Sequence, residues 1–274
     1  MEPRCSAPPI CNILSIAGID PSGGAGLLAD LKVFAALGTY GCGVVTALTA
    51  QNTRAVTGIH PVPPEFLALE IDTLFADVRI DAVKIGMLAS SELIHVVADA
   101  LKRYNPAYVV LDPVMVAKSG DRLLRADAVA ALKAELLPLA TVLTPNLPEA
   151  SDLLGHEVAG APEGMRSAAG ALHTMGARTV LMKGGHMTGD RLVDIFYDGK
   201  IFIELPTDRI PTKNTHGTGC ALSSAIAALA PQRASLEQAV RDARDYVIDA
   251  IRGSHQLSVG HGHGPLHHFH SLWR

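Results

Sequence analysis

The sequence predicts an α/β fold in which a mostly parallel central sheet has helices on both faces. Short apolar runs, such as 82–85 and 108–111, alternate with longer helical patterns along the whole chain. Apolar strands of only four or five residues are typical of parallel strands that are buried on both faces. No internal repeat or low-complexity linker divides the 274 residues, so we expect one domain over 1–274.

The first expected element is a strand over 10–16, which leads through a turn-rich loop at 18–26 into a helix. Leu27, Leu31 and Phe34 recur in that helix at i, i+4 and i+7, which is the spacing of one helical face. In doubly wound sheets, ligands bind beyond the carboxyl ends of the strands. We therefore expect the loop at 18–26 to border a binding site.

The remaining elements continue this alternation. An Asp198-Gly199 pair between two β-like runs predicts a hairpin. Further strands are expected over 44–48, 82–85, 108–111, 141–143, 179–182, 192–197 and 201–205, and helices after Gly217 and over 236–251.

The composition excludes several classes of protein. Hydrophobic residues make up 48% and charged residues 18%, which suits a packed core and excludes a disordered chain. The formal net charge is only −4, without a basic run, and aromatic residues make up 4%. We therefore expect neither a nucleic-acid partner nor an anionic membrane surface as partner.

Two uncharged stretches, 33–53 and 214–232, are long enough to raise the question of a membrane span. Both contain glycines and polar side chains, so we interpret them as buried elements flanked by loops. The N-terminal segment lacks the apolar region of a signal peptide, and the four cysteines have no paired spacing. These features predict a soluble, cytoplasmic protein without a disulfide framework or a structural zinc site.

A glycine-rich turn, Asn-Thr-His-Gly-Thr-Gly-Cys at 214–220, stands directly before an apolar helix. Gly217 and Gly219 let the backbone approach a ligand closely, and the first turn of the helix offers free N–H groups to a negative charge. We interpret this turn as an anion hole for a phosphate or a developing negative charge. The alternative is an ordinary glycine-rich loop.

Cys220 falls in the first turn of the same helix. There the helix dipole is expected to lower a thiol pKa from its usual value of about 8.5. Cys220 is therefore a candidate base or nucleophile. The alternative, a small apolar side chain that fills space, is the commoner fate of a lone helical cysteine.

Two carboxylates, Asp112 and Glu149, stand just after predicted strands. Oxygen ligands at this edge of a sheet suit Mg²⁺, whose waters Asn146 could order, although Asn146 before Pro148 also fits a helix cap. Lys183 also follows a strand and could reach a polyphosphate; a solvent-facing lysine is the alternative. The sequence has neither a P-loop nor a dinucleotide fingerprint, so a nucleotide would have to bind by another scheme.

Six histidines stand between His255 and His270, near the end of the chain. No carboxylate or cysteine stands among them to complete a metal site. We therefore expect these histidines to pack structurally rather than to bind a metal.

These motifs belong to a longer set of segments in a fixed order. The set comprises 17–26, 29–32, 49–53, 84–88, 111–115, 117–120, 144–150, 181–186, 214–220 and the closing Gly-Pro-Leu-His-His-Phe-His. Together the segments resemble the hydroxymethylpyrimidine/phosphomethylpyrimidine kinases of thiamine biosynthesis, a family of the ribokinase-like superfamily. The resemblance runs from about residue 12 to the end of the chain.

The resemblance implies a ribokinase-like fold and a kinase that depends on ATP and Mg²⁺. Such a kinase first phosphorylates the hydroxymethyl group of 4-amino-5-hydroxymethyl-2-methylpyrimidine and then converts the monophosphate into the diphosphate. The resemblance also implies a homodimer.

Roles for individual residues follow from the same resemblance. Gln51 would read the aminopyrimidine edge, for which an amide is suited because it offers both a donor and an acceptor. The pyrimidine pocket would also be lined by Gly18, Ala25, Asp30, Met87 and Val114, and the metal would be bound by Asp112 and Glu149. ATP would be contacted by Lys183, Asn146 and Thr215, and the anion hole would be formed by Gly217, Thr218 and Gly219.

Cys220 matches the catalytic position, where many sugar kinases of the superfamily carry aspartate. Because phosphoryl transfer passes through a loose transition state, positioning and charge matter more than a strong base, and a partly ionised thiol is expected to suffice for the alcohol. The acceptor of the second step is a phosphate that is already ionised, so we expect that step to need no base.

The nearest alternative is a vitamin B6 kinase, because some pyridoxal kinases of the superfamily share the Gly-Thr-Gly-Cys turn. Their substrate is also a flat heteroaromatic hydroxymethyl compound, but Gln51 favours the aminopyrimidine. A sugar kinase agrees less well with the sequence, because many sugar kinases of the superfamily carry aspartate at the position of Cys220. A catalytically silent binding protein would be expected to have lost Cys220, Asp112, Glu149 or Lys183, all of which are present.

Overall fold

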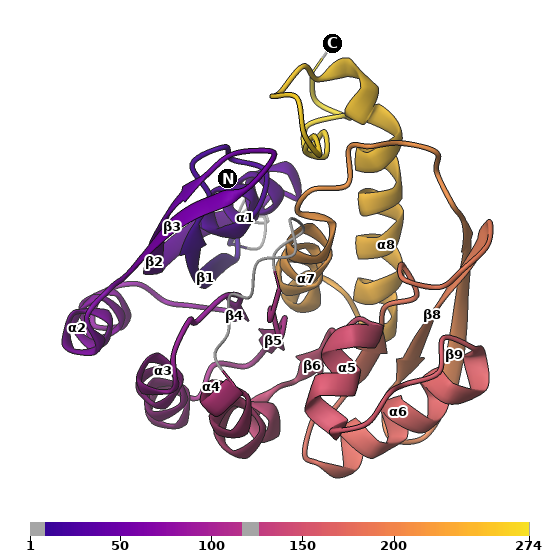
Figure 1. Ribbon diagram of the computed structural model, residues 1–274. Coiled ribbons are helices and arrows are strands. Elements are labelled where there is room, and N and C mark those ends of the chain that lie inside the picture. Colours follow the sequence, from indigo (N-terminus) through magenta and orange to yellow (C-terminus); the bar gives the residue numbers. More distant parts are fainter. Residues whose placement is uncertain (1–8, 117–125, 274) are drawn as a thin grey trace, which may run out of the picture.

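A nine-stranded sheet forms the centre of the computed structural model, which describes residues 9–116 and 126–273 (Figure 1). The strands are β1 (Asn12–Ile19), β2 (Tyr40–Gln51), β3 (Val56–Pro61), β4 (Ala82–Ile85), β5 (Val109–Leu111), β6 (Val142–Leu143), β7 (Val180–Met182), β8 (Arg191–Tyr197) and β9 (Phe202–Asp208). Their order across the sheet is β3-β2-β1-β4-β5-β6-β7-β8-β9.

The central part of this sheet is parallel. Strands β2, β1, β4, β5, β6 and β7 run in one direction, whereas β3, β8 and β9 pair antiparallel at the two edges. The expected mostly parallel sheet is therefore confirmed, and so is the hairpin around Asp198-Gly199. The segment 117–120, which contributed to the family resemblance, lies outside the described residues.

Helices cover both faces of the sheet. They are α1 (Gly26–Ala36), α2 (Pro64–Phe75), α3 (Ser91–Tyr104), α4 (Ala126–Ala131), α5 (Leu147–Leu154), α6 (Pro162–Thr174), α7 (Thr218–Leu229) and α8 (Leu236–Gly253), with short helical turns at Leu132–Leu136, Leu137–Leu139, Ala230–Gln232 and Ser254–Gln256. Helices α1, α7 and α8 cover one face, and α2 to α6 cover the other (Figure 1).

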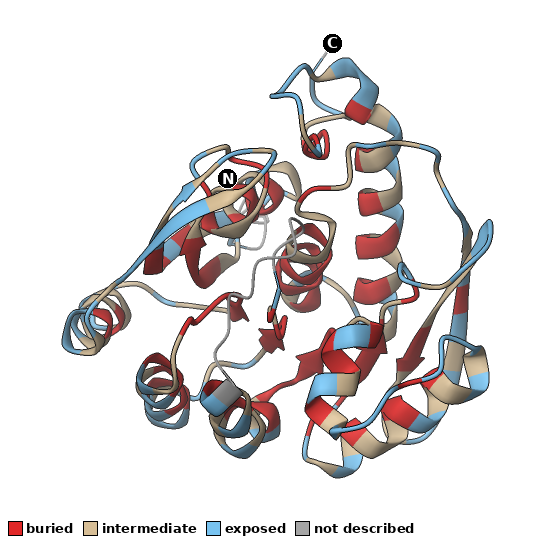
Figure 2. Ribbon diagram, in the orientation of Figure 1, coloured by how far each residue is buried: buried red, intermediate tan, exposed pale blue. Residues whose placement is uncertain are grey.

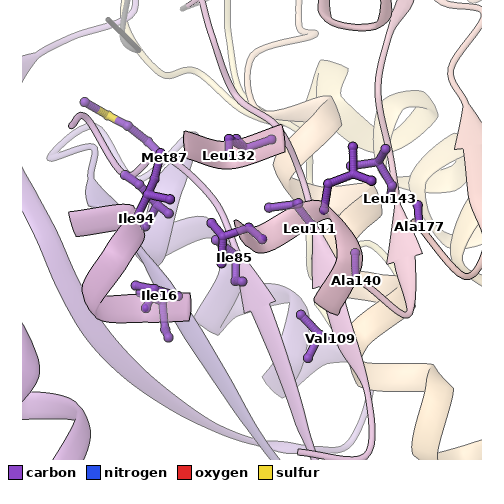
Figure 3. Packing of buried hydrophobic residues seen from close by; sticks show 14 of the residues in the cluster. Ile16, Ile85, Met87, Ile94, Val109, Leu111, Leu132, Ala140, Leu143 and Ala177 are labelled. Atoms are coloured by element: carbon purple, nitrogen blue, oxygen red, sulfur yellow. The ribbon is translucent and has the colours of Figure 1, made fainter. Parts of the chain in front are cut away.

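Each face of the sheet has its own hydrophobic core. On the side of α2 to α6, Ile85, Leu111 and Leu143 from neighbouring strands belong to one buried cluster with Ile94 and Leu132 from the helical layer (Figure 3). Alternate residues along a strand point to opposite faces, so the short strands supply apolar side chains to both cores. Because both faces of these strands are buried, their sequences are apolar runs that do not alternate between apolar and polar residues.

Of the two uncharged stretches, 214–232 is largely buried, as expected, whereas 33–53 is only partly buried, with Tyr40 and Leu48 exposed. The stretch 214–232 contains α7, whose residues 221–229 are all buried between the sheet and its neighbours (Figure 2). The stretch 33–53 contains the end of α1 and the whole of β2. Within the described residues, no helix is both long enough and apolar enough to cross a membrane.

Strand β3 was not predicted from the sequence. It is an edge strand that pairs only with β2, and five of its six residues are exposed. Because an exposed edge strand does not have to bury apolar side chains, its sequence lacks the apolar run on which the prediction depended. Strand β1 begins later and ends later than the predicted range 10–16, and β2 extends beyond the predicted range 44–48 at both ends.

A charged pair lies inside the core beneath α7. Lys84 of β4 and Asp30 of α1 are both completely buried, with Nζ 2.7 Å from Oδ2. Ser15 of β1 donates to the same oxygen at 2.6 Å, and Ser224 of α7 donates to Oδ1 at 2.7 Å. Burial acts to lower the pKa of Lys84, but the Asp30 carboxylate outweighs it and raises the pKa, so the lysine stays charged.

We expect Lys84→Met to lower the free energy of unfolding by about 3–5 kcal/mol, because the buried Asp30 carboxylate would lose its cation. The double variant Lys84→Met/Asp30→Asn removes both charges and should recover most of this loss. Urea unfolding at neutral pH measures both variants. Arg252, which pairs with Asp249 on the surface, provides the control: Arg252→Ala should cost less than about 0.5 kcal/mol. A Lys84→Met protein as stable as this control would contradict the prediction.

Candidate functional site

The predicted site residues gather around a cavity of about 810 Å³ at the carboxyl ends of the parallel strands. All of them but one line this cavity: Gly18, Ala25, Gln51, Met87, Asp112, Val114, Asn146, Glu149, Lys183, Thr215, Gly217, Thr218, Gly219 and Cys220. Their loops follow different strands, and the parallel sheet brings those loops to one edge.

Asp30 is the exception. The sequence resemblance placed it in the pyrimidine pocket, but the structure buries it completely and leaves it outside the lining. Its two oxygens accept hydrogen bonds from Ser15, Lys84 and Ser224. Asp30 therefore supports the floor of the site, and Lys84, which does line the cavity, was missed. An apolar strand with one lysine in its middle was the available signal.

The first turn of α7 faces a cation and a carboxylate. Gly217 caps the helix with φ of 79°, and a Cβ there would lie 1.9 Å from the carbonyl oxygen of Gly24. A Cβ on Gly219 would lie 3.2 Å from Lys183 Nζ and 3.7 Å from Asp112 Oδ2. The glycines thus leave room for a ligand between the free N–H groups of α7 and the lysine, which is the arrangement of an anion site.

Lys183 bridges the two predicted metal ligands. Its Nζ lies 2.9 Å from Asp112 Oδ1 and 3.6 Å from Glu149 Oε2. Burial acts to raise the pKa of Asp112, but the ammonium groups of Lys183 and Lys84 outweigh it and lower the pKa. For Glu149, burial is the largest effect and, with the negative charge of Asp112, raises the pKa to about 7 despite Lys183.

The donors present fit a magnesium ion that is held mainly by phosphates. Within the described residues, no group of three or more His, Cys, Asp or Glu side chains is arranged to hold a metal. Magnesium needs only one or two carboxylates when waters and substrate phosphates complete its shell. Asp112 and Glu149 are such carboxylates. Asn146 also forms the capping box of α5 with Glu149, so the capping alternative is confirmed for this residue.

The expected lowering of the Cys220 pKa is wrong. Burial, the largest effect, raises the pKa of this thiol to about 11, and the carboxylates of Asp30 and Asp112 act in the same direction. The Lys84 ammonium and a backbone hydrogen bond from Gly26 offset only part of this. The position at a helix N-terminus does not compensate for lost water and nearby negative charge, so the thiol is protonated at neutral pH.

A buried Asp20–His216 pair was missed by the sequence analysis. His216 Nε2 lies 2.7 Å from Asp20 Oδ2, and the backbone N–H groups of Ser22 and Ala25 also donate to this carboxylate. Burial acts to raise the pKa of Asp20, but the hydrogen bonds from His216 and Ser22 lower it. The pair joins the loop at 18–26 to the glycine-rich turn at 214–220, which we call the anion turn. Both residues stood in conspicuous glycine-rich segments, but the sequence does not show that these segments meet.

A second missed pair holds the backbone after Lys183. Asp194 Oδ1 accepts from the N–H of Gly184 at 2.7 Å, and Arg244 Nε donates to Asp194 Oδ2 at 2.7 Å. Arg244 also donates to the carbonyl of Leu205 at 2.6 Å. The α8 helix therefore fixes the turn that carries Lys183, and Asp194 and Arg244 both line the cavity.

Gln51 reaches the opposite end of the cavity. It is the last residue of β2, and its Oε1 lies 3.2 Å from Thr49 Oγ1. The Thr49 hydroxyl donates to the carbonyl of Ile19 at 2.8 Å, which links the end of β2 to the end of β1. Thr46 donates to the carbonyl of Met87 at 2.6 Å and fixes that side of the pocket.

The C-terminal histidines differ from one another in burial. His267 and His268 are only 3% and 4% exposed, as expected for packing residues. Burial lowers the pKa of His268 to about 4, so its ring is neutral at neutral pH. His261 and His263 are exposed.

Comparisons with known proteins match this chain to a family of pyrimidine kinases and, by structure, also to pyridoxal kinases. The family model described as phosphomethylpyrimidine kinase matches residues 20–267. A hydroxymethylpyrimidine/phosphomethylpyrimidine kinase of Rhizobium meliloti is 51% identical over 261 residues, which covers 95% of this chain and 98% of the relative. Among solved structures, phosphomethylpyrimidine kinase from Clostridium difficile 630 has a TM-score of 0.79 and 40% identity, covering 88% of this chain and 99% of that one. Pyridoxal kinase from Staphylococcus aureus in complex with AMP-PCP has a TM-score of 0.89 and 34% identity, covering 97% and 96%.

We expect Cys220 to be alkylated by iodoacetamide much more slowly at pH 7 than a free cysteine peptide, because almost none of its thiol is ionised. Its rate should keep rising beyond pH 9, where the rate of the peptide levels off near its own pKa. Mass spectrometry of the peptide that contains Cys220 follows this residue alone, and Cys220→Ser is the control. A rate that levels off below pH 8 would contradict the raised pKa.

Proposed function

Since this chain belongs to the phosphomethylpyrimidine kinase family, we propose that it uses ATP to phosphorylate 4-amino-5-hydroxymethyl-2-methylpyrimidine and then the resulting monophosphate, in thiamine biosynthesis. The observation that carries this proposal is the shared cavity. It brings Gln51, the anion turn before Cys220, and Lys183 to one space that is large enough for a nucleotide and a small heterocycle together.

The pyrimidine binds at the end of the cavity near Gln51. The amide there can donate to one ring position of an aminopyrimidine and accept from another. Gly18, Ala25, Met87 and Val114 complete this end with small and apolar surfaces that suit a flat methylated ring. The hydroxymethyl group then points toward the first turn of α7.

The nucleotide occupies the other end. Its lining includes the polar segment 207–209 and an apolar surface for a base, formed by Ile210, Pro211, Val247, Ile248 and Ile251. Lys183 supplies a positive charge for the phosphates, with Asn146 and Thr215 beside it. Asp112 and Glu149 would hold Mg²⁺, which neutralises phosphate charge when bound.

The glycine turn stabilises the transferred group. In a loose transition state, negative charge lies on the three equatorial oxygens of the phosphoryl group, and fixed N–H donors lower its energy most. The N–H groups at 217–219 belong to the cap and first turn of α7, which hold them in place, and Gly217 packs so closely on Gly24 that a Cβ would lie 1.9 Å from its carbonyl oxygen. Cys220 lies at the acceptor side of this turn and receives the alcohol proton when its thiol is ionised.

A pyridoxal kinase is the second candidate. The similarity to the Staphylococcus aureus enzyme, with a TM-score of 0.89, favours it, since this chain superimposes on that structure almost throughout. The higher identity to the Rhizobium meliloti relative, 51% against 34%, favours the pyrimidine. The homodimer implied by the resemblance and the cytoplasmic location predicted from the sequence features stay predictions, and light scattering of the purified protein checks the first.

We expect two ADP to be released per hydroxymethylpyrimidine, because one site carries out both phosphorylations. A coupled assay with Mg·ATP, with the pyrimidine and pyridoxal supplied separately at equal concentration, measures this ratio. Pyridoxal turnover should be weak. Preferential pyridoxal turnover, with at most one ADP per pyrimidine, would assign the chain to the vitamin B6 kinases.

We expect the alcohol step to depend on Cys220 and the monophosphate step not to. With a thiol pKa of about 11, the ionised fraction rises about tenfold per pH unit at lower pH, so the rate of the first step should rise similarly between pH 7 and 9. The phosphate acceptor has lost its proton by pH 7, so its rate should stay nearly flat. Cys220→Ala should slow the first step by about 10²-fold or more. Equal losses in both steps would disprove this role.

A further inference from the structure

The C-terminal residues 260–268, which we call the strap, pass alongside the turn between β2 and β3. The backbone N–H of Gly262 donates to Thr53 Oγ1 at 3.0 Å, and the N–H of His263 donates to the Thr53 carbonyl at 2.9 Å. Thr53 is only two residues beyond Gln51, which is the last residue of β2. This part of the strap is therefore linked to the strand end that carries the glutamine.

The next residues of the strap hold the anion turn. The carbonyl of Gly264 accepts from the N–H of His216 at 3.0 Å, and Pro265 pairs with His216 in a parallel bridge. His216 is the residue immediately before Gly217. The yellow C-terminal end in Figure 1 accordingly lies between the β2–β3 turn and the orange segment that leads into α7.

These contacts are close because the strap is rich in glycine. A Cβ on Gly262 would lie 2.0 Å from the Thr53 carbonyl oxygen, and a Cβ on Gly264 would lie 2.1 Å from Asn214 Oδ1. Asn214 also donates to the Ser254 carbonyl at 3.0 Å, which adds a link from the anion turn to the end of α8.

The far end of the strap is fixed to the core. Leu266 is 1% exposed and belongs to the hydrophobic cluster around α7 and α8. The N–H of His267 donates to the Ala250 carbonyl, and Tyr246 donates to the His268 carbonyl, both at 3.0 Å. Helix α8 thus provides a rigid base, from which the strap reaches both loops.

We infer that the strap sets the positions of both the pyrimidine-reading end and the anion turn of the site, with Thr53 and Gly264 as positioning residues. The kinetic consequences rest on the proposed function. Gln51 contacts the pyrimidine ring equally in the ground state and the transition state, so a loosened Thr53 raises KM with little change in kcat. The anion turn acts on charge that develops in the transition state, so a displaced Gly264 lowers kcat.

The kinetic experiment compares variants at the two contacts. Thr53→Val removes the hydroxyl acceptor and should raise KM for the pyrimidine about three- to tenfold, the range expected for one neutral hydrogen bond, whereas Thr53→Ser keeps the acceptor and should restore the wild-type value. Gly264→Ala should lower kcat at least tenfold with little change in KM, because small displacements at a reacting centre are costly. Asn214→Ala, which loosens the same turn without a clash, should lower kcat in the same direction.

The matched control is Gly170→Ala in α6, where a Cβ meets no atom within 4 Å and kinetics should not change. Equal changes of KM and kcat in Thr53→Val and Gly264→Ala, in proportion to a loss of melting temperature, would show a general scaffold and overturn the inference.

Amide hydrogen exchange tests the strap without any substrate. Thr53→Val should speed exchange at Gly262 and His263 and also at 216–219, since the strap transmits the change, while Thr53→Ser and Gly170→Ala should exchange like the wild type. Unchanged exchange at 216–219 in Thr53→Val would overturn the inference, whether or not the protein phosphorylates the pyrimidine. Absence of pyrimidine turnover by the wild type would instead contradict the proposed function, and exchange would still decide the role of the strap.

Discussion

The position of α7 depends on two buried carboxylates that its consecutive serines contact. Ser224 donates to Asp30, which Lys84 neutralises, and Ser223 donates to Asp112 at 3.3 Å. A buried carboxylate without such partners is costly, so these contacts fix the helix relative to β4 and β5. Since the first turn of α7 forms the anion turn, the ion pair beneath the sheet edge determines where a phosphoryl group can be held.

The two lysines of the site are paired with carboxylates before any ligand enters. Lys84 pairs with Asp30, and Lys183 lies beside Asp112 and Glu149, whose raised pKa of about 7 lets its charge change near neutral pH. The same negative surroundings, together with burial, keep the Cys220 thiol protonated. A site of this kind holds a polyanion by fixed geometry and by Lys183 rather than by a large excess of positive charge, which agrees with the absence of a basic run in the sequence.

Contacts between distant segments hold the loops of the site in place. Asp20 and His216 join the first glycine-rich loop to the last one, and Arg244 with Asp194 fixes the turn after Lys183. The strap adds a third link, from α8 to the ends of both loops. Each of these pairs spans at least 50 residues or lies at a chain end, so the geometry of the site forms only when the whole sheet has folded.

The apolar runs alone predict the parallel sheet, because strands buried on both faces must be apolar on both faces. The sequence also shows which loops carry polar and glycine residues at the strand ends. All of the predicted site residues except Asp30 line the cavity, although many other residues that line it were not identified. Only the tertiary structure showed that Asp30 lies beneath the site in an ion pair with Lys84, that Asp20 meets His216, and that Cys220 has a raised pKa. The physical reason is that burial and the distances between charges depend on how remote segments pack, whereas helix ends and glycine turns are local features that a sequence displays directly.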